Sequence, residues 1–253
     1  MSELLSSTED GILTLTLNRP EKRNALNDSL IGGLKEAIRD SDAKPGLRSI
    51  IIRGAGKDFC SGADLSALRK IADNGILENL EDAESLMELF QLMRRCRVPV
   101  IAAVHGRALA GGCGLATACD LVLASETARF GYPEVKIGFV PAMVMAILRR
   151  NISEKQAFEL ITQGFDFSAG YAKEIGLINE VYPDEGFDED VAAYVGRYMK
   201  LSASAVALSK KLLYQMDSMT FDNALSIGAE INAIARLTDD CQNGISRFLD
   251  KSD

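Results

Sequence analysis

Apolar and polar positions alternate in period two near the start of the chain and then recur at helical spacing. Ile12–Leu17 (ILTLTL) has the strand period, and Pro20 follows, which has no N–H to offer a sheet. From a predicted N-cap at Asp28, apolar residues recur at helical spacing as far as Ile38. Residues 48–54 (RSIIIRG) then return to a strand pattern. This order predicts a βαβ unit with parallel strands.

The stretch from residue 98 to residue 120 predicts a buried strand that leads into a helix of small residues. Residues 98–104 form a β-branched apolar run, and residues 110–118 are almost all small. At Gly111 and Gly112 no side chain shields the backbone, and first-turn amides have no acceptor within the helix. These N–H groups suit an anion or a developing oxyanion. The alternative is that the small residues only let the helix lie close to the strand.

The second half of the chain is predicted to be mainly helical. Ser153 and Gln156 form a capping box, Ser168 is a predicted N-cap, and a brief extended segment covers residues 177–182. Helix follows helix after that point. We expect an α/β part over residues 1–190, which carries the site, and a helical region over residues 191–253.

Composition narrows the functional classes. The 253 residues are 47% hydrophobic and 25% charged, which is typical of a globular protein, and the net charge of −8 argues against a nucleic-acid-binding surface. The five cysteines lack CxxC spacing, so neither a metal site nor a disulfide framework is expected. No apolar run approaches the roughly 20 residues that span a bilayer, and no leader pattern opens the chain. We expect a cytoplasmic protein that binds neither membrane nor nucleic acid.

Candidate chemistry centres on one carboxylate. Glu134 follows Pro133 within an otherwise apolar segment, and such surroundings favour acid–base behaviour by desolvation. The alternative is a solvated loop glutamate or a helix-terminal charge. His105 is the single histidine, and a hydrogen-bonded turn residue explains it as well as a catalytic base does. Neither GxGxxG after the first strand nor GxxxxGK[ST] occurs.

Six motifs along the chain, in order, resemble those of the crotonase (enoyl-CoA hydratase/isomerase) superfamily. They are LNRPEKRNAL at residues 17–26, DFCSGADL at 58–65, VHGRALAGGCGLATACD at 104–120, FGYPEVKIGFVP at 130–141, AKEIGLINEVYP at 172–183 and GISRFLDK at 244–251. The resemblance covers almost the whole chain. It implies an α/β fold: a spiral of ββα turns with two nearly perpendicular sheets, followed by a C-terminal helical region that joins homotrimers or hexamers.

The resemblance also implies a ligand and a site. The ligand is an acyl-CoA thioester, whose coenzyme A enters as part of the substrate, with no separate cofactor. The backbone N–H groups of Ala63 and Gly111 would hold the thioester oxygen, and Glu134 would handle protons. Residues expected to border CoA are Lys22, Arg23, Ala25, Ser61, Ala63, Asp64 and Leu65, with Phe248 and Lys251 reaching the ligand of a neighbouring subunit.

Gly114 departs from the family pattern. Hydratases of the family carry one of two catalytic glutamates at this place, and here only the other, Glu134, is kept. A single carboxylate suits transfer of a proton between carbons, which favours an isomerase that converts 3-enoyl-CoA into 2-enoyl-CoA. Hydration aided by another donor, decarboxylation or hydrolysis of an acyl-CoA, and a non-catalytic CoA-binding homologue remain alternatives. Tyr132, Asp64 and Cys113 are candidate helpers.

Overall fold

Two sheets form the centre of the protein. The computed structural model describes residues 2–64, 67, 69, 70 and 73–250. The larger sheet has the order β1-β2-β3-β4-β6-β9, and the smaller has the order β5-β7-β8. The strands are β1 (Leu4–Glu9), β2 (Ile12–Leu17), β3 (Ser49–Gly54), β4 (Val100–Val104), β5 (Arg107–Leu109), β6 (Leu121–Ser125), β7 (Arg129–Gly131), β8 (Asp166–Ser168) and β9 (Glu180–Tyr182). Two sheets are what the resemblance implies.

The first strand, β1, is absent from the sequence-based expectations. It pairs with β2 antiparallel, in register from Leu4↔Leu17 to Glu9↔Ile12. The turn between them has positive φ at both Asp10 (46°) and Gly11 (73°), as a two-residue hairpin turn with the strand twist requires. Asp-Gly between two strands is the sequence signal for such a turn, and it was available here.

The other strands of the large sheet confirm the predicted parallel pairing. β2 runs parallel to β3, β3 to β4, β4 to β6 and β6 to β9. Helix α1 (Asp28–Ser41) makes the crossover from β2 to β3. The predicted N-cap at Asp28 is wrong by one residue, because the Asn27 side chain accepts the hydrogen bond from the Leu30 N–H at 2.9 Å. The predicted capping box at Ser153 is confirmed.

The chain repeats one path: a strand in the large sheet, a short strand in the small sheet, then a helix. β4 leads to β5 and to α4 (Gly111–Ala118), and β6 leads to β7 and to the 3-10 helix η2 (Pro133–Ile137). Cys60 forms a parallel bridge with Ala108 of β5, so the preceding turn, after β3, reaches the same layer. Residues that follow the short strand in each turn are therefore stacked beside one another.

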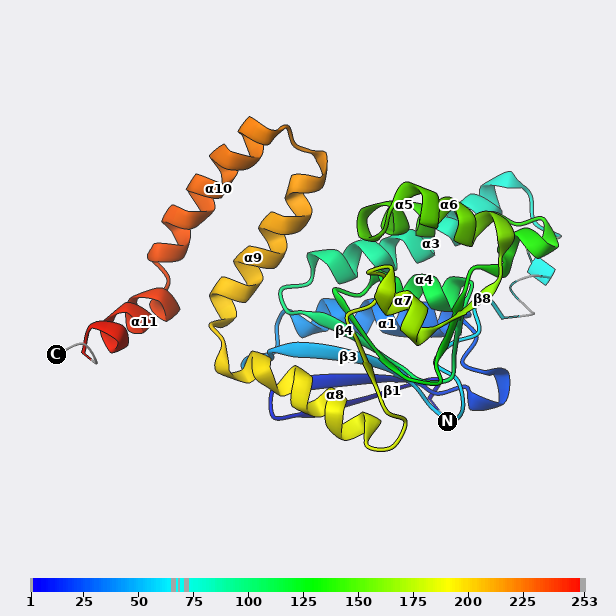
Figure 1. Cartoon of the computed structure of the whole chain (residues 1–253), viewed down its shortest axis with the longest axis horizontal. Helices are drawn as coiled ribbons and strands as arrows, with labels where there is room; N and C mark the ends of the chain where they lie inside the picture. The colour runs from blue at the N-terminus through cyan, green and yellow to red at the C-terminus, as the bar shows by residue number, and fades with distance from the viewer. Residues whose placement is uncertain (1, 65–66, 68, 71–72, 251–253) are drawn as a thin grey trace.

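Helices cover both faces of the large sheet. On one face the main core packs against α1, α3 (Ile76–Arg95), α5 (Ala142–Asn151), α6 (Glu154–Gln163) and α7 (Ala169–Glu174). On the other face α8 (Phe187–Val195) buries Phe187, Val191 and Val195 against Ile101 and Leu123. The expected domain boundary between residues 190 and 191 falls inside α8. After α8 the chain continues into α9 (Ala203–Gln215), which leads to the last helices of the chain (Figure 1).

A buried ion pair holds α9 against this body. The Lys210 ammonium donates to the carbonyl oxygens of Met93 and Val98 at 2.8 and 2.9 Å, and to Asp120 Oδ2 at 2.6 Å. Tyr214 donates to the other oxygen of Asp120 at 2.6 Å. The donors of one side chain on α9 thus meet two carbonyls and a carboxylate of the core, which fixes where the last helices leave the body.

The last two helices expose apolar side chains. α10 (Phe221–Arg236) and α11 (Asp239–Leu249) extend beyond α9, and none of their described residues is buried (Figure 1). Phe221 is 77% exposed and Leu237, just after α10, is 83% exposed. Within the described part of the chain, no helix combines the length and the apolar character needed to cross a membrane.

Candidate active site

Three successive turns of the spiral supply the three residues expected to carry the chemistry. Ala63 comes three residues after the Cys60 bridge, Gly111 two residues after β5, and Glu134 three residues after β7. β5 and β7 are parallel, with Ala108 opposite Phe130, and the Ala110 N–H donates to the Gly131 carbonyl at 2.9 Å. Ala63, Gly111 and Glu134 therefore come shortly after the same layer in neighbouring turns.

The segment before Ala63 lies directly against the start of α4. A Cβ atom added to Gly62 would lie 2.8 Å from Ala110 Cβ and 3.4 Å from the Gly111 nitrogen. Gly62 also has a φ of +97°, so both space and backbone conformation require glycine there. The residue before Ala63 therefore lies against the start of α4, where Gly111 stands.

Hydrogen bonding sets the direction of the Ala63 amide. The Leu26 N–H donates to the Gly62 carbonyl at 2.7 Å, and the Asp64 N–H donates to the Leu26 carbonyl at 2.9 Å. In a parallel bridge of this kind the residue between the two bonds turns its own N–H to the opposite side. The Ala63 N–H therefore faces away from Leu26, and the Gly111 N–H belongs to the first turn of α4, where amides lack intrahelical acceptors.

Ala110, the N-cap of α4, has a strained backbone. Its φ of 49° and ψ of −128° lie in a region that non-glycine residues seldom occupy, at a cost of roughly 1–3 kcal/mol. Such strain persists only where the surroundings enforce it, and here the Ala110 N–H is bonded to the Gly131 carbonyl. The strained residue orients the first peptide of α4, which carries the Gly111 N–H.

Glu134 is a buried carboxyl group at the start of η2. Pro133 precedes it and fixes its backbone approach, and the Glu134 carbonyl accepts from the Phe139 N–H at 3.0 Å. Burial raises the pKa of Glu134 above its ordinary value. Its Oε2 atom is buried and has no hydrogen-bond partner among the described residues. An unpartnered carboxylate oxygen of raised pKa is suited to receive and return a proton.

Apolar groups fill the space beside Gly114. A Cβ on Gly114 would lie 2.7 Å from Val144 Cγ2 of α5 and 3.6 Å from the Phe90 ring of α3. Both side chains are buried. The absence of a carboxylate at residue 114 is therefore accompanied by a neighbouring helix that packs into the space beside it.

The candidate helpers beside Glu134 are held inside the protein. Tyr132 is fully buried, and its hydroxyl lies 3.3 Å from Thr117 Oγ1. Burial raises the pKa of the Cys113 thiol to about 12, so this group is not poised as a nucleophile. His105 lies elsewhere: its Nε2 is 2.9 Å from the Gly56 carbonyl oxygen, in a polar groove that none of Ala63, Gly111 and Glu134 lines.

Most of the expected CoA-binding residues lie in two loops, one after β2 and one after β3. Lys22 and Arg23 are exposed and basic, Ala25 is buried, and Ser61 is half-buried, with its N–H donating to the Arg23 carbonyl at 3.0 Å. Asp64 is buried and forms an ion pair with Arg19. Phe248 lies on α11 and is 73% exposed. Leu65 and Lys251, which the resemblance also implies, lie outside the described residues.

Two residues of this region were missed by the sequence reasoning. Arg19 is 4% exposed and contacts both loops, and Asn24 is fully buried with a φ of 53°. The Asn24 amide donates to the carbonyl oxygens of Ala55 and Asp58, at 2.8 and 2.7 Å. From sequence alone, Arg19 and Asn24 are expected to be exposed to solvent, because they are polar residues on either side of a turn at Pro20. Only the asparagine, a residue that tolerates positive φ, offered a signal.

Comparison with known proteins places the chain in a family. The family model for enoyl-CoA hydratase/isomerase matches residues 7–253. A putative enoyl-CoA hydratase of Thermus thermophilus is 40% identical over 240 residues, which is 95% of each chain. The 2,3-dehydroadipyl-CoA hydratase of Escherichia coli is 32% identical, over 99% of this chain and 97% of its own.

Solved structures agree with the sequence relatives. The enoyl-CoA hydratase of Mycobacterium smegmatis superimposes with a TM-score of 0.94 at 32% identity, covering 99% of this chain and 97% of that one. The human enoyl-CoA hydratase domain-containing protein 3 gives 0.93 at 29% identity, over 98% of both chains. The chain belongs to the enoyl-CoA hydratase/isomerase family, the crotonase superfamily, and it has the crotonase fold. Among the described residues, no group of His, Cys, Asp and Glu side chains is arranged to hold a metal ion.

The packing at Gly114 makes a stability prediction. We expect Gly114→Ala to destabilise the protein by about 1–3 kcal/mol, because the added methyl overlaps Val144 Cγ2 in a packed core. Gly32→Ala is the matched control: it also lies inside a helix, and nothing lies within 4 Å of its added Cβ, so a gain of about 1 kcal/mol is expected. Urea unfolding of both variants measures this. Equal stability changes would contradict the packing account.

The buried carboxyl group makes a pH prediction. The folded pKa of Glu134 is raised, so its contribution to stability is full below its unfolded pKa and is lost as the pH rises through the folded pKa. Glu134→Gln removes that loss. Its stability relative to the wild type should therefore increase with pH across this window and then level off, as measured by urea unfolding at several pH values. A flat difference for Glu134→Gln would contradict the assignment.

Proposed function

We propose that this protein converts 3-enoyl-CoA thioesters into 2-enoyl-CoA thioesters, with one carboxylate and two backbone amides. Glu134 carries the proposal: among the described residues it is the buried carboxylate with an unpartnered oxygen, whereas buried Asp58 and Asp64 are bonded to Arg107 N–H and to Arg19. Coenzyme A enters as part of the substrate, and we propose no separate cofactor.

The proposed reaction needs one group that moves a proton and one that stabilises the negative charge on the thioester oxygen. The Glu134 carboxylate takes a proton from C2 of the 3-enoyl thioester, and the C–H electrons move into a dienolate whose charge lies on the thioester oxygen. The N–H groups of Ala63 and Gly111 hold that oxygen. Glu134 then returns the proton to C4, and the double bond moves from C3=C4 to C2=C3. One amide donor of this type is typically worth roughly 2.7–4 kcal/mol in an acyl-transfer site.

The environment of Gly114 supports isomerisation over hydration. Adding water across a double bond requires a group that positions and activates the water, and a second carboxylate does this in the hydratases that the sequence resembles. Val144 and Phe90 instead place apolar groups beside residue 114. A hydrocarbon surface near the acyl chain does not bind water, so it favours transfer of a proton between the substrate and Glu134 over addition of water.

Hydration of 2-enoyl-CoA is the second candidate. It is favoured by the names of similar proteins, since the relatives in Thermus thermophilus and Escherichia coli are called hydratases. The two reactions are separable, because hydration gives a 3-hydroxyacyl-CoA and isomerisation conserves the mass of the substrate.

Turnover of an acyl-CoA panel tests the assignment. We expect conversion of 3-enoyl-CoA without a change of mass, and a fall of at least about 100-fold in kcat for Glu134→Gln, because an acid–base group of this kind contributes about 10²–10⁴-fold. The exposed Glu159→Gln is the control that keeps wild-type turnover. The ultraviolet absorbance of the conjugated 2-enoyl thioester follows isomerisation, and mass spectrometry of the products detects hydration, decarboxylation or hydrolysis.

Other outcomes of that assay would overturn the assignment. Full turnover by Glu134→Gln would remove its role, and a 3-hydroxyacyl-CoA as the main product would establish hydration. Release of CO₂ or of free CoA would indicate decarboxylation or hydrolysis. Binding of acyl-CoA without turnover of any thioester would indicate a non-catalytic homologue.

We also propose that the protein assembles as a homotrimer or a pair of trimers. α10 and α11 bury none of their described residues, yet they carry exposed apolar side chains such as Phe221, Leu225 and Phe248. Exposed apolar faces of this extent mark interaction surfaces. A second copy of the chain suits this surface because the family resemblance implies trimers joined by the C-terminal helices.

Sedimentation tests the assembly. We expect the wild type to sediment as a trimer or hexamer, and Leu225→Asp on α10, which is 59% exposed in the single chain, to dissociate it. Glu230→Gln on the same helix changes only an exposed polar residue and should leave the assembly intact. A wild-type monomer at micromolar concentration would contradict the proposal.

A further inference from the structure

Arg19 is a buried charge that the proposed reaction does not use. It lies between Asn18 and Pro20 in the loop after β2, and its side chain is 4% exposed. Burying a guanidinium group is costly unless its donors meet acceptors. The contacts of Arg19 show which segments it joins.

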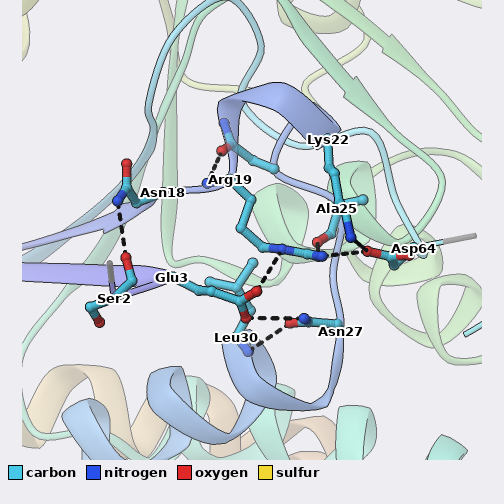
Figure 2. A network of polar contacts seen from close by, with 10 residues as sticks. Ser2, Glu3, Asn18, Arg19, Lys22, Ala25, Asn27, Leu30 and Asp64 are labelled. Atoms are coloured by element: carbon cyan, nitrogen blue, oxygen red, sulfur yellow. Dashed lines mark hydrogen bonds and ion pairs between the residues drawn. The ribbon is translucent and has the colours of Figure 1, made fainter. Parts of the chain in front are cut away.

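The guanidinium group joins three separate segments, as Figure 2 shows. Nε lies 3.0 Å from Glu3 Oε1, Nη1 donates to the Ala25 carbonyl at 2.6 Å, and Nη2 donates to Asp64 Oδ2 at 2.5 Å. Glu3 in turn accepts from the Asn27 amide at 3.0 Å, and Asn27 caps α1. One planar cation thus fixes the N-terminal segment, the first loop and the residue after Ala63 at once.

We propose that Arg19 is a positioning residue for the oxyanion site: by holding the Asp64 side chain and the Ala25 carbonyl together, it fixes the peptide that carries the Ala63 N–H. This inference rests on the proposed function, because it gives Arg19 a task at that same site. Arg19 itself contacts neither the substrate oxygen nor the reacting carbons in the proposed chemistry.

The backbone bonds around Ala63 show why the side-chain contact matters. The Gly62 carbonyl and the Asp64 N–H are both tied to Leu26, and Ala25, which Arg19 holds, is the residue just before Leu26. On the side opposite Asp64, Gly62 has a φ of +97°, so that side of the segment has no side chain to restrain it. Arg19 restrains both strands of this short ladder, and the direction of the Ala63 N–H follows from the ladder.

Lysine cannot replace arginine in this arrangement. The guanidinium group offers several donors in one plane, which allows a carbonyl and a carboxylate to be held in fixed relative orientation, whereas an ammonium is a point charge on a flexible stem. Lys22 illustrates the difference: its ammonium is 3.7 Å from the same Asp64 oxygen, and its side chain is 55% exposed. Charge alone is therefore already present beside Asp64, and geometry is what Arg19 adds.

Arg19→Lys and Asp64→Asn test the inference in the full-length protein. We expect kcat on 3-enoyl-CoA to fall about 10- to 100-fold in Arg19→Lys, because small misplacements of a positioned group cost up to about that much, with a smaller change in KM. The second readout is the carbonyl stretch of a bound saturated acyl-CoA, measured by isotope-edited infrared spectroscopy. Polarisation by two N–H donors lowers this frequency in the wild type. In both variants the frequency should be lowered less than in the wild type.

A second arginine–aspartate pair provides the control. Arg53 Nη2 lies 2.9 Å from Asp188 Oδ1 on the other side of the large sheet, so Arg53→Lys makes the same chemical change away from Ala63. It should keep kcat and the infrared shift. Thermal unfolding of all variants shows whether each is folded, and Asp64→Asn, which keeps the shape of the side chain, serves if Arg19→Lys does not fold.

The outcomes separate this inference from the proposed function. Wild-type turnover and carbonyl shift that persist unchanged in folded Arg19→Lys and Asp64→Asn would overturn the inference alone. A loss that Arg53→Lys reproduces in both readouts would reduce Arg19 to a general structural role and also overturn it. A wild type that shows no carbonyl shift would overturn the oxyanion site, and the role of Arg19 with it.

Discussion

The parallel stacking of short strands in successive turns of the spiral is the constraint on which the site depends. Cys60 bridges Ala108, and Ala108 pairs with Phe130, so three turns are held in one register. Ala63 and Gly111 come three positions beyond that layer and Glu134 comes four positions beyond it, although more than 20 residues separate consecutive members along the chain. The proposed site thus depends on the register, and a slip of one residue would separate its parts.

Helix α5 packs closely against α4 beside Gly114. Val144 and Phe90 fill the space beside Gly114, so the small residue and its large neighbours form one packed unit. A carboxylate side chain at residue 114 would therefore require a change on α5 as well. Glu134 stays buried, with one unpartnered oxygen among the described residues. A buried carboxylate at residue 134 and hydrocarbon beside residue 114 are together the physical basis for proposing proton transfer within the substrate.

Buried polar residues in the loop after β2 connect the part of the protein expected to border CoA to the segment that carries the Ala63 amide. Arg19 and Asn24 bond the loop after β2 to the segment around residues 55–64, and Lys22 and Arg23 are exposed on the same loop. Partly satisfied networks of this kind are costly, whereas fully bonded ones make a segment rigid. The loop expected to border CoA and the segment that carries the Ala63 amide are therefore one rigid unit. The C-terminal helices α10 and α11, in contrast, bury none of their described residues against the rest of the chain.

The sequence by itself determined the elements and the family. Period-two and helical patterns located β2, α1, β3 and α4, capping residues such as Ser153 and Ser168 located helix starts, and six motifs identified the superfamily. These signals are local, because they depend on residues within one or two turns of each other. Only the tertiary structure decided which residues from distant segments lie in contact. Three features depend on contacts between distant segments, which no local pattern encodes. Val144 fills the space at Gly114, Arg19 reaches Asp64 across 45 positions, and Glu134 has a buried oxygen with no partner in the described part of the chain.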